Sequence, residues 1–112
     1  MAKYKLLVMT KPVEGREREY NDWYQNVHLV DLVDIPGVKS AQRFRLKLPV
    51  APGAERLPYV AIYDIETDDI AGVMKELTGR VADGRMVISD AMSKENFGGV
   101  YEEFGALVTA DD

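Results

Sequence analysis

The sequence predicts an α+β domain in which two helices cover one face of a four-stranded sheet. Strand-like and helix-like periodicities follow one another in the order β-α-β-β-α-β along the 112 residues, with turn-forming residues between them. The length fits one domain, residues 1–112, and no internal linker or repeat interrupts it.

The first strand is expected at Lys3–Lys11, where alternate side chains fall on opposite faces. From Leu6 onward both faces are apolar, which is typical of a sheet that is covered on both sides. The turn-forming residues 12–15 end this strand.

The first helix is expected from Arg16 to about Val27. Its apolar residues recur at the spacing of one helix face: Tyr20, Trp23, Tyr24 and Val27. Asn21 and the other polar residues of the segment are assigned to the solvent side. The pattern weakens after His28, and Ile35-Pro36-Gly37 ends any helix.

The second and third strands are expected at Val38–Leu48 and Tyr59–Ile65. The second alternates, with Phe44 on one face and Arg43 on the other. The third is a nearly continuous apolar run, which is typical of a central strand.

Thr67 is the predicted N-cap of the second helix, and Gly84 is its predicted stop. A last strand is expected at Gly99–Val108, where Gly105 permits a bulge. The acidic tail from Thr109 is expected to lie outside the packed domain.

The net charge of −5 and the absence of cysteine limit the classes of function. Nucleic-acid binding needs a surplus of Lys and Arg on one face, so no nucleic-acid partner is expected. The longest apolar run near the N-terminus, Leu6–Met9, is too short for a signal peptide or a membrane span. The sequence therefore favours a cytoplasmic protein without disulfides or membrane contact.

Two helices cover only one face of the predicted sheet, although the strands are apolar on both. A second copy of the chain, packed sheet against sheet, is the expected cover.

The segment from Asp22 to Leu32, Asp-Trp-Tyr-Gln-Asn-Val-His-Leu-Val-Asp-Leu, precedes Pro36-Gly-Val38 and Gln42-Arg-Phe44. This pattern resembles the dimeric α/β-barrel (ferredoxin-like) superfamily, in particular its EthD-like branch, typified by ethyl tert-butyl ether degradation proteins. The resemblance implies a ferredoxin-like domain that dimerises into an α/β barrel. It implies no single reaction, since relatives include cofactor-free muconolactone isomerases, polyketide cyclases, dehydratases and small monooxygenases. Val30 stands where many relatives have proline, which leaves the end of the first helix open.

His28, the only histidine, is the foremost candidate for catalysis. An imidazole near its ordinary pKa acts as a general acid or base at neutral pH. Asp31 follows at i+3, the spacing at which a carboxylate could orient the ring. The structural alternatives are a histidine that interacts with the helix dipole and an aspartate that caps the helix-to-loop junction.

Six aromatic residues are predicted to line an apolar pocket: Trp23, Tyr24, Phe44, Tyr59, Tyr63 and Tyr101. Tyr24 shares a helix edge with His28, so its hydroxyl is a candidate donor to a developing oxyanion. The alternative for each of these side chains is ordinary core packing.

Arg43 is a candidate for binding an anionic group of a substrate. Its neighbours Lys39, Arg45 and Lys47 favour instead an exposed strand edge that faces water or the acidic residues of a partner. Metal-ligand spacings, a phosphate-binding loop and a Gly-x-Ser-x-Gly elbow are all missing, so neither metal nor cofactor is expected. Some distant barrel relatives nevertheless hold haem through a histidine.

Taken with the resemblance, these residues predict a cofactor-independent lyase or isomerase of small-molecule catabolism or secondary metabolism. Its substrate would be an apolar or aromatic carbonyl, lactone or phenolic compound. In this hypothesis His28 moves the proton, Tyr24 and Tyr63 hold the oxygen, and Trp23 and Phe44 shape the pocket. The alternatives are a cofactorless monooxygenase of the same fold and a non-catalytic ligand-binding or structural dimer.

Overall fold

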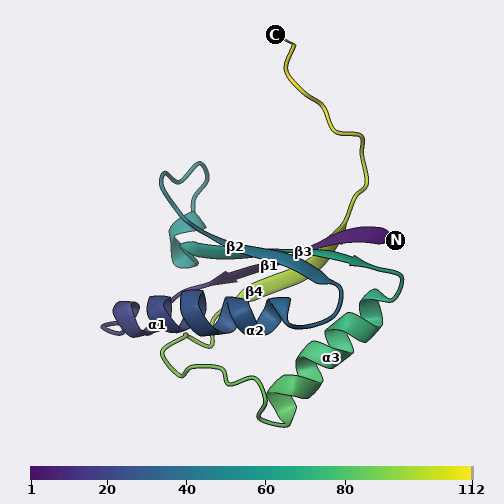
Figure 1. Ribbon diagram of the computed structural model, residues 1–112. Coiled ribbons are helices and arrows are strands. Elements are labelled where there is room, and N and C mark those ends of the chain that lie inside the picture. The colour runs from purple at the N-terminus through teal and green to yellow at the C-terminus, as the bar shows by residue number, and fades with distance from the viewer. Residues whose placement is uncertain (112) are drawn as a thin grey trace.

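The structure, a computed structural model, describes residues 1–111 and has the predicted order of elements. Its strands are β1 (Ala2–Thr10), β2 (Val38–Arg45), β3 (Tyr59–Thr67) and β4 (Phe97–Glu102). They form one antiparallel sheet with the spatial order β2-β3-β1-β4. The long helices lie on one side of this sheet and leave the other face bare (Figure 1). This is the predicted α+β, ferredoxin-like arrangement.

The first helical segment extends beyond its predicted end and changes pitch on the way. The helix α1 (Glu17–Trp23) passes into a π-helical turn, η1 (Tyr24–His28), and then into α2 (Leu29–Val33). A π turn inserts one residue into the helical repeat, so that Leu29 follows Tyr24 into the core. Val27 is 44% exposed, and its predicted place on the buried face is wrong.

The helix α3 (Ile70–Ala82) begins later than predicted. Its N-cap is Asp69, whose side chain accepts a hydrogen bond from the Gly72 N–H, whereas Thr67 accepts one from the Asp69 N–H. Gly84, with φ of +85°, follows the helix end in the left-handed conformation that glycine adopts freely.

The last strand also differs from its predicted range. β4 begins before Gly99 and ends at Glu102, so Gly105 lies outside the sheet and forms no bulge. A short 3₁₀ turn, η2 (Ala54–Arg56), lies in the connection between β2 and β3.

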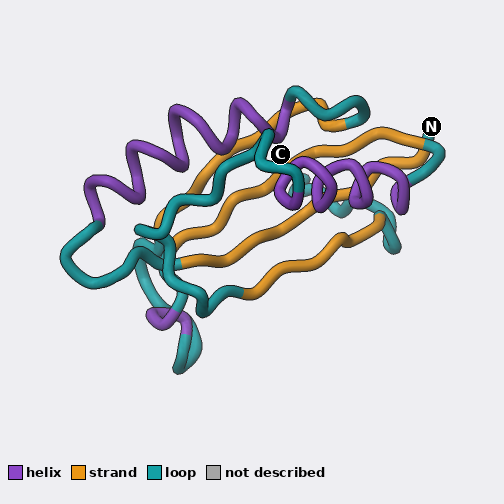
Figure 2. Tube along the Cα trace, turned by 90° about the horizontal axis from the view of Figure 1, so that it is seen from below, coloured by secondary structure: helices purple, strands orange, loops and turns teal. Residues whose placement is uncertain are grey.

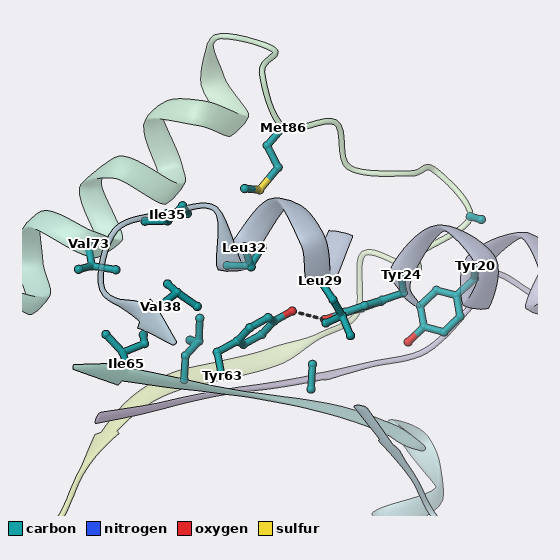
Figure 3. Packing of buried hydrophobic residues seen from close by; sticks show 13 residues of the cluster. Tyr20, Tyr24, Leu29, Leu32, Ile35, Val38, Tyr63, Ile65, Val73 and Met86 are labelled. Atoms are coloured by element: carbon teal, nitrogen blue, oxygen red, sulfur yellow. Dashed lines mark hydrogen bonds between the residues drawn. The ribbon is translucent and has the colours of Figure 1, made fainter. Parts of the chain in front are cut away.

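The core lies between the helices and the sheet, and Figure 3 shows its side chains converging from both layers. The loop 83–96 runs alongside the first helical segment (Figure 2). Two contacts fix this loop to the rest of the domain. The Met86 side chain is buried in the core and is 2% exposed, and the Val13 N–H donates a hydrogen bond to the Ala91 carbonyl at 2.7 Å. This loop therefore forms an outer wall next to Trp23, whose indole N–H donates to the Val87 carbonyl at 3.2 Å.

The bare face of the sheet carries many apolar side chains. Leu7 pairs with Ile62, and these two alternate with the buried residues of β1 and β3. The other apolar residues of this face are Met9, Phe44, Val60, Phe97 and Tyr101. Within residues 1–111, every helix is too short or too polar to cross a membrane.

Candidate functional site

Two tyrosines from opposite layers meet at the centre of the candidate site. Tyr24 lies at the start of η1 and Tyr63 lies on β3, and each side chain is 1% exposed. The Tyr63 hydroxyl donates to the Tyr24 hydroxyl at 3.5 Å (Figure 3). Burial raises the pKa of both hydroxyls, so both stay neutral and can donate a hydrogen bond.

The imidazole of His28 lies between Trp23 and Tyr24. It stacks on the indole, with ring centroids 4.8 Å apart and planes inclined by 23°, and it meets the Tyr24 ring edge-on at 5.0 Å. The π turn produces this stack, because Trp23 and His28 are five residues apart and a π-helix aligns residues at that spacing. π turns of this kind are frequent at functional sites.

His28 is partly buried, and its Nδ1 is enclosed without a hydrogen-bond partner in residues 1–111. Burial lowers the pKa of this imidazole from 6.5 to about 4, because its charged form loses hydration and gains no counter-charge. The expectation of an ordinary imidazole pKa is therefore not met. At neutral pH His28 is an uncharged base.

Asp31 does not join His28, although their spacing predicts contact. Within the described part of the chain, the Asp31 carboxylate makes no hydrogen bond or ion pair to the imidazole. It lies instead beside a surface groove with Arg80 and Arg85. The ring of His28 is positioned by Trp23 rather than by a carboxylate.

Arg43 lies on the helix-covered face of β2, and the favoured interpretation of an exposed edge is wrong for this residue. Its guanidinium carbon is 4.6 Å from the centre of the Tyr24 ring, 5.3 Å from that of Tyr20 and 5.2 Å from that of Tyr59. Its Nη2 donates to the Asn21 side-chain oxygen at 2.8 Å. Arg43 is thereby brought next to Tyr24, within the candidate site.

Phe44 does not lie with Trp23. It pairs with Val60 on the bare face of the sheet and is 44% exposed. Because neighbouring strand residues point to opposite faces, the position of Arg43 under the helix places Phe44 on the far side. Tyr101 lies on the same bare face, opposite Lys5.

Two polar residues of the site are missing from the sequence-based prediction. Thr10 is 1% exposed, and its hydroxyl is hydrogen-bonded to that of Tyr20. Thr10 is four residues from Leu6 on the same strand, so both side chains fall on the same face, and this spacing predicts the burial of Thr10. Asn21 bridges Arg43 and the Tyr59 hydroxyl, to which its amide donates at 3.4 Å. Nothing in the local pattern separates Asn21 from the solvent-facing residues around it.

The arrangement combines an uncharged base, two neutral phenols and one guanidinium within a tyrosine cluster. Such a set can take up a proton and donate hydrogen bonds to an oxygen that gains negative charge. Among residues 1–111, no three side chains of the His, Cys, Asp and Glu types gather into a group that could hold a metal ion.

Comparison with known proteins gives a fold and a relative that matches about half of the chain. No family model matches the chain. Core atranone cluster (CAC) protein 1 of Stachybotrys chlorohalonatus is 36% identical over 63 residues, which are 54% of this chain. The matched segment is 25% of that protein, so the chain spans about a quarter of its relative's length.

Solved structures match nearly the whole chain. An ethyl tert-butyl ether degradation (EthD) family protein of Bacillus halodurans C-125 has a TM-score of 0.61 and 18% identity, over 93% of this chain and 100% of its own. A dimeric ferredoxin-like protein of unknown function from Jannaschia sp. CCS1 has a TM-score of 0.59 and 13% identity, over 90% and 99%. A suggested monooxygenase of Shewanella loihica PV-4 has a TM-score of 0.59 and 17% identity, over 94% and 97%. The chain has the ferredoxin-like fold of these proteins, and the resemblance to the EthD-like branch is confirmed at the level of the fold.

Proposed function

We propose that the protein is a cofactor-independent lyase or isomerase that moves a proton next to a carbonyl group of a small apolar or aromatic molecule. The observation that carries this proposal is the enclosed Nδ1 of His28. A buried nitrogen without a partner is costly, and such atoms in a native fold call for an explanation. Nδ1 is closed off from solvent, so the proton of the neutral imidazole is assigned to Nδ1 and the substrate meets the other ring nitrogen, Nε2.

In the proposed reaction, His28 takes a proton from the carbon next to the carbonyl. The electron pair of the broken C–H bond moves into an enolate, and the Tyr24 hydroxyl donates a hydrogen bond to the enolate oxygen. Tyr63 supports that hydroxyl from the strand side. The imidazolium then returns its proton to another carbon, which completes an isomerisation, or to a departing group, which completes an elimination.

The low pKa of His28 fixes its charge state at the start of this cycle. An imidazole with a pKa of about 4 is unprotonated at pH 7 and ready to accept a proton. The charged imidazolium formed inside the site is poorly stabilised, so it returns the proton readily. Asp31 has no part in this scheme, because it does not contact the ring.

A homodimer formed through the bare sheet face completes the proposal. The seven apolar and aromatic residues of that face need a cover, and a solved structure of the same fold is described as dimeric. The absence of cysteine agrees with a cytoplasmic location. The similarity to a core atranone cluster protein of Stachybotrys chlorohalonatus, over 63 residues, is the sequence relation behind a role in small-molecule metabolism.

The reaction class can be tested in D₂O, because an enolate that regains its proton from the exchangeable imidazolium takes up deuterium, either next to the carbonyl or at the carbon that receives the proton. We expect aromatic β-keto acids or unsaturated lactones to gain deuterium, measured by mass spectrometry, and His28→Gln to reduce the rate by about 10²- to 10⁴-fold. Val30→Gln, an exposed change on α2, is the matched control and should keep the wild-type rate. Equal rates for His28→Gln and the wild type would rule out His28 as the base.

A cofactorless monooxygenase is the second candidate, supported by the fold shared with the suggested monooxygenase of Shewanella loihica. This reaction consumes dioxygen, whereas proton transfer does not. Turnover that persists under nitrogen supports the lyase or isomerase. Turnover that stops without dioxygen supports the monooxygenase. A protein that binds ligands but changes none of them is the non-catalytic alternative.

Dimerisation is tested by placing a charge at the centre of the bare face. We expect Ile62→Lys to raise the dissociation constant of the dimer by about 100-fold or more, because a lysine buried without a partner loses its hydration. Light scattering across micromolar concentrations measures the change. Thr78→Lys, which adds the same charge on α3, should leave the dimer intact. A wild-type protein that is monomeric under these conditions would contradict the sheet-to-sheet assembly.

A further inference from the structure

The guanidinium of Arg43 is a partly buried cation without a carboxylate partner. None of the ion pairs among residues 1–111 includes Arg43. Partly buried arginines are usually paired, because an unpaired charge loses hydration without compensation. Here only the tyrosine faces and Asn21 compensate it.

The hydrogen bonds of Arg43 leave part of the guanidinium available. Of its five N–H groups, two meet acceptors with hydrogen-bond geometry, and both acceptors are on Asn21: the side-chain oxygen at 2.8 Å and the main-chain carbonyl at 3.5 Å. The guanidinium also lies near the Tyr20 hydroxyl, whose nearest hydrogen-bond partner is Thr10. A fork-shaped donor held in one orientation by a neighbouring amide suits a planar bidentate acceptor.

A surface groove of about 670 Å³ opens beside this guanidinium, between the first helix and the edge strand β2. Its volume is within the range of small-molecule sites. The groove is lined by three cations, Arg43, Arg45 and Lys47, and by one carboxylate, Asp22. Phe44 and Leu46 also belong to its lining. In a chain with a net charge of −5, this local excess of positive charge attracts anions.

We propose that the groove at Arg43 binds an organic carboxylate, with the carboxylate on the guanidinium and the rest of the molecule along the groove between the first helix and β2. The Asn21 side chain accepts a hydrogen bond from the guanidinium and donates one to the Tyr59 hydroxyl, so these three groups form one network that holds the guanidinium in place. Arg45 and Lys47 draw the anion into the groove. The inference rests on the proposed function only in identifying this carboxylate as part of the substrate.

A carboxylate-binding site explains the presence of an arginine at position 43 better than packing alone does. A methionine or leucine would fill the space among three tyrosines without any cost of desolvation. The tyrosine faces orient a cation but leave its edge free to donate. An anion at that edge supplies the missing counter-charge.

Binding is tested with benzoate as the probe and benzamide, its uncharged counterpart, as the comparison. We expect benzoate to bind with a millimolar dissociation constant and to shift the NMR signals of the Asn21 side-chain amide and the Arg43 Nε–H. Benzamide should bind at least tenfold more weakly, and added sodium chloride should weaken benzoate but not benzamide.

Arg43→Met should weaken benzoate binding at least tenfold, with Lys39→Met as the control. Lys39 lies on the same strand outside the groove, and its substitution changes the net charge equally. Should Arg43→Met unfold the protein, Arg45→Met combined with Lys47→Met tests the groove at exposed positions and should weaken binding at least threefold.

The results of these experiments distinguish a failure of the carboxylate site from a failure of the proposed reaction. Benzoate binding that is unaffected by Arg43→Met and by the double substitution overturns the carboxylate site, even if deuterium exchange proceeds. Binding that depends on Arg43 supports the site, even if no carbonyl compound gains deuterium. In that second case the proposed catalysis fails and the binding site stands.

Discussion

A proton NMR titration is expected to show no change of the His28 ring signals between pH 8 and pH 5.5, followed by a transition near pH 4. The chain has one histidine, so its Cε1–H signal is assigned without ambiguity. The shift of the pKa to about 4 has a physical cause in burial under Trp23 and Tyr24 without a counter-charge. A transition near pH 6.5 would show instead that water reaches the whole ring.

The same shift couples protonation to stability. In the unfolded chain His28 takes up a proton as the pH falls through about 6.5, whereas in the folded protein it stays neutral until about 4. Protons therefore favour the unfolded state across this window, and the free energy of unfolding falls as the pH decreases from 6.5 to 4. The full loss is about 3 kcal/mol.

Urea unfolding at a series of pH values measures this loss. His28→Gln cannot be protonated, so its stability should decline less steeply than that of the wild type between pH 6.5 and pH 5. Below pH 5 carboxylates titrate in both proteins, and only the difference between the two curves belongs to His28. Parallel curves throughout the window would contradict the burial of the imidazole.

The fold can be predicted from patterns of neighbouring residues in the sequence. The period-two pattern of Lys3–Lys11 and the apolar run from Tyr59 predict strands, and Gly84 ends a helix because glycine adopts positive φ freely. These signals depend on neighbouring residues only. The strand order and the bare sheet face follow because few topologies satisfy them.

The site depends on two features that local patterns do not display. The π turn at Tyr24–His28 shifts the helical phase by one residue, which moves Val27 outward and stacks His28 on Trp23. Arg43 meets three tyrosines that are distant from it along the chain, and so its environment depends on tertiary packing. A strand with alternating charged residues is predicted to be exposed, and the sequence of the strand does not reveal that a helix covers one of its faces. The interpretation of Arg43 as a solvent-facing edge residue failed for this reason.

Substitution of Tyr24 by alanine is expected to destabilise the protein more than any other single change in the site. The ring is 1% exposed and contacts Tyr20, Trp23, His28 and Arg43. Its removal leaves a cavity at the junction of helix and sheet, with a cost of about 3–5 kcal/mol. This is a large part of the 5–15 kcal/mol that stabilises a typical domain, and urea unfolding measures it directly.

Tyr24→Phe separates the packing of the ring from the chemistry of its hydroxyl. The phenyl ring keeps every aromatic contact and loses only the hydroxyl, whose bond to Tyr63 is long at 3.5 Å. We expect a loss of about 1 kcal/mol or less in the free energy of unfolding. If the hydroxyl donates to the enolate oxygen, deuterium exchange should nevertheless slow by about 10²-fold or more. A variant that keeps both stability and exchange would remove Tyr24 from the mechanism and leave it as a core residue, because packing alone requires the ring but not its oxygen.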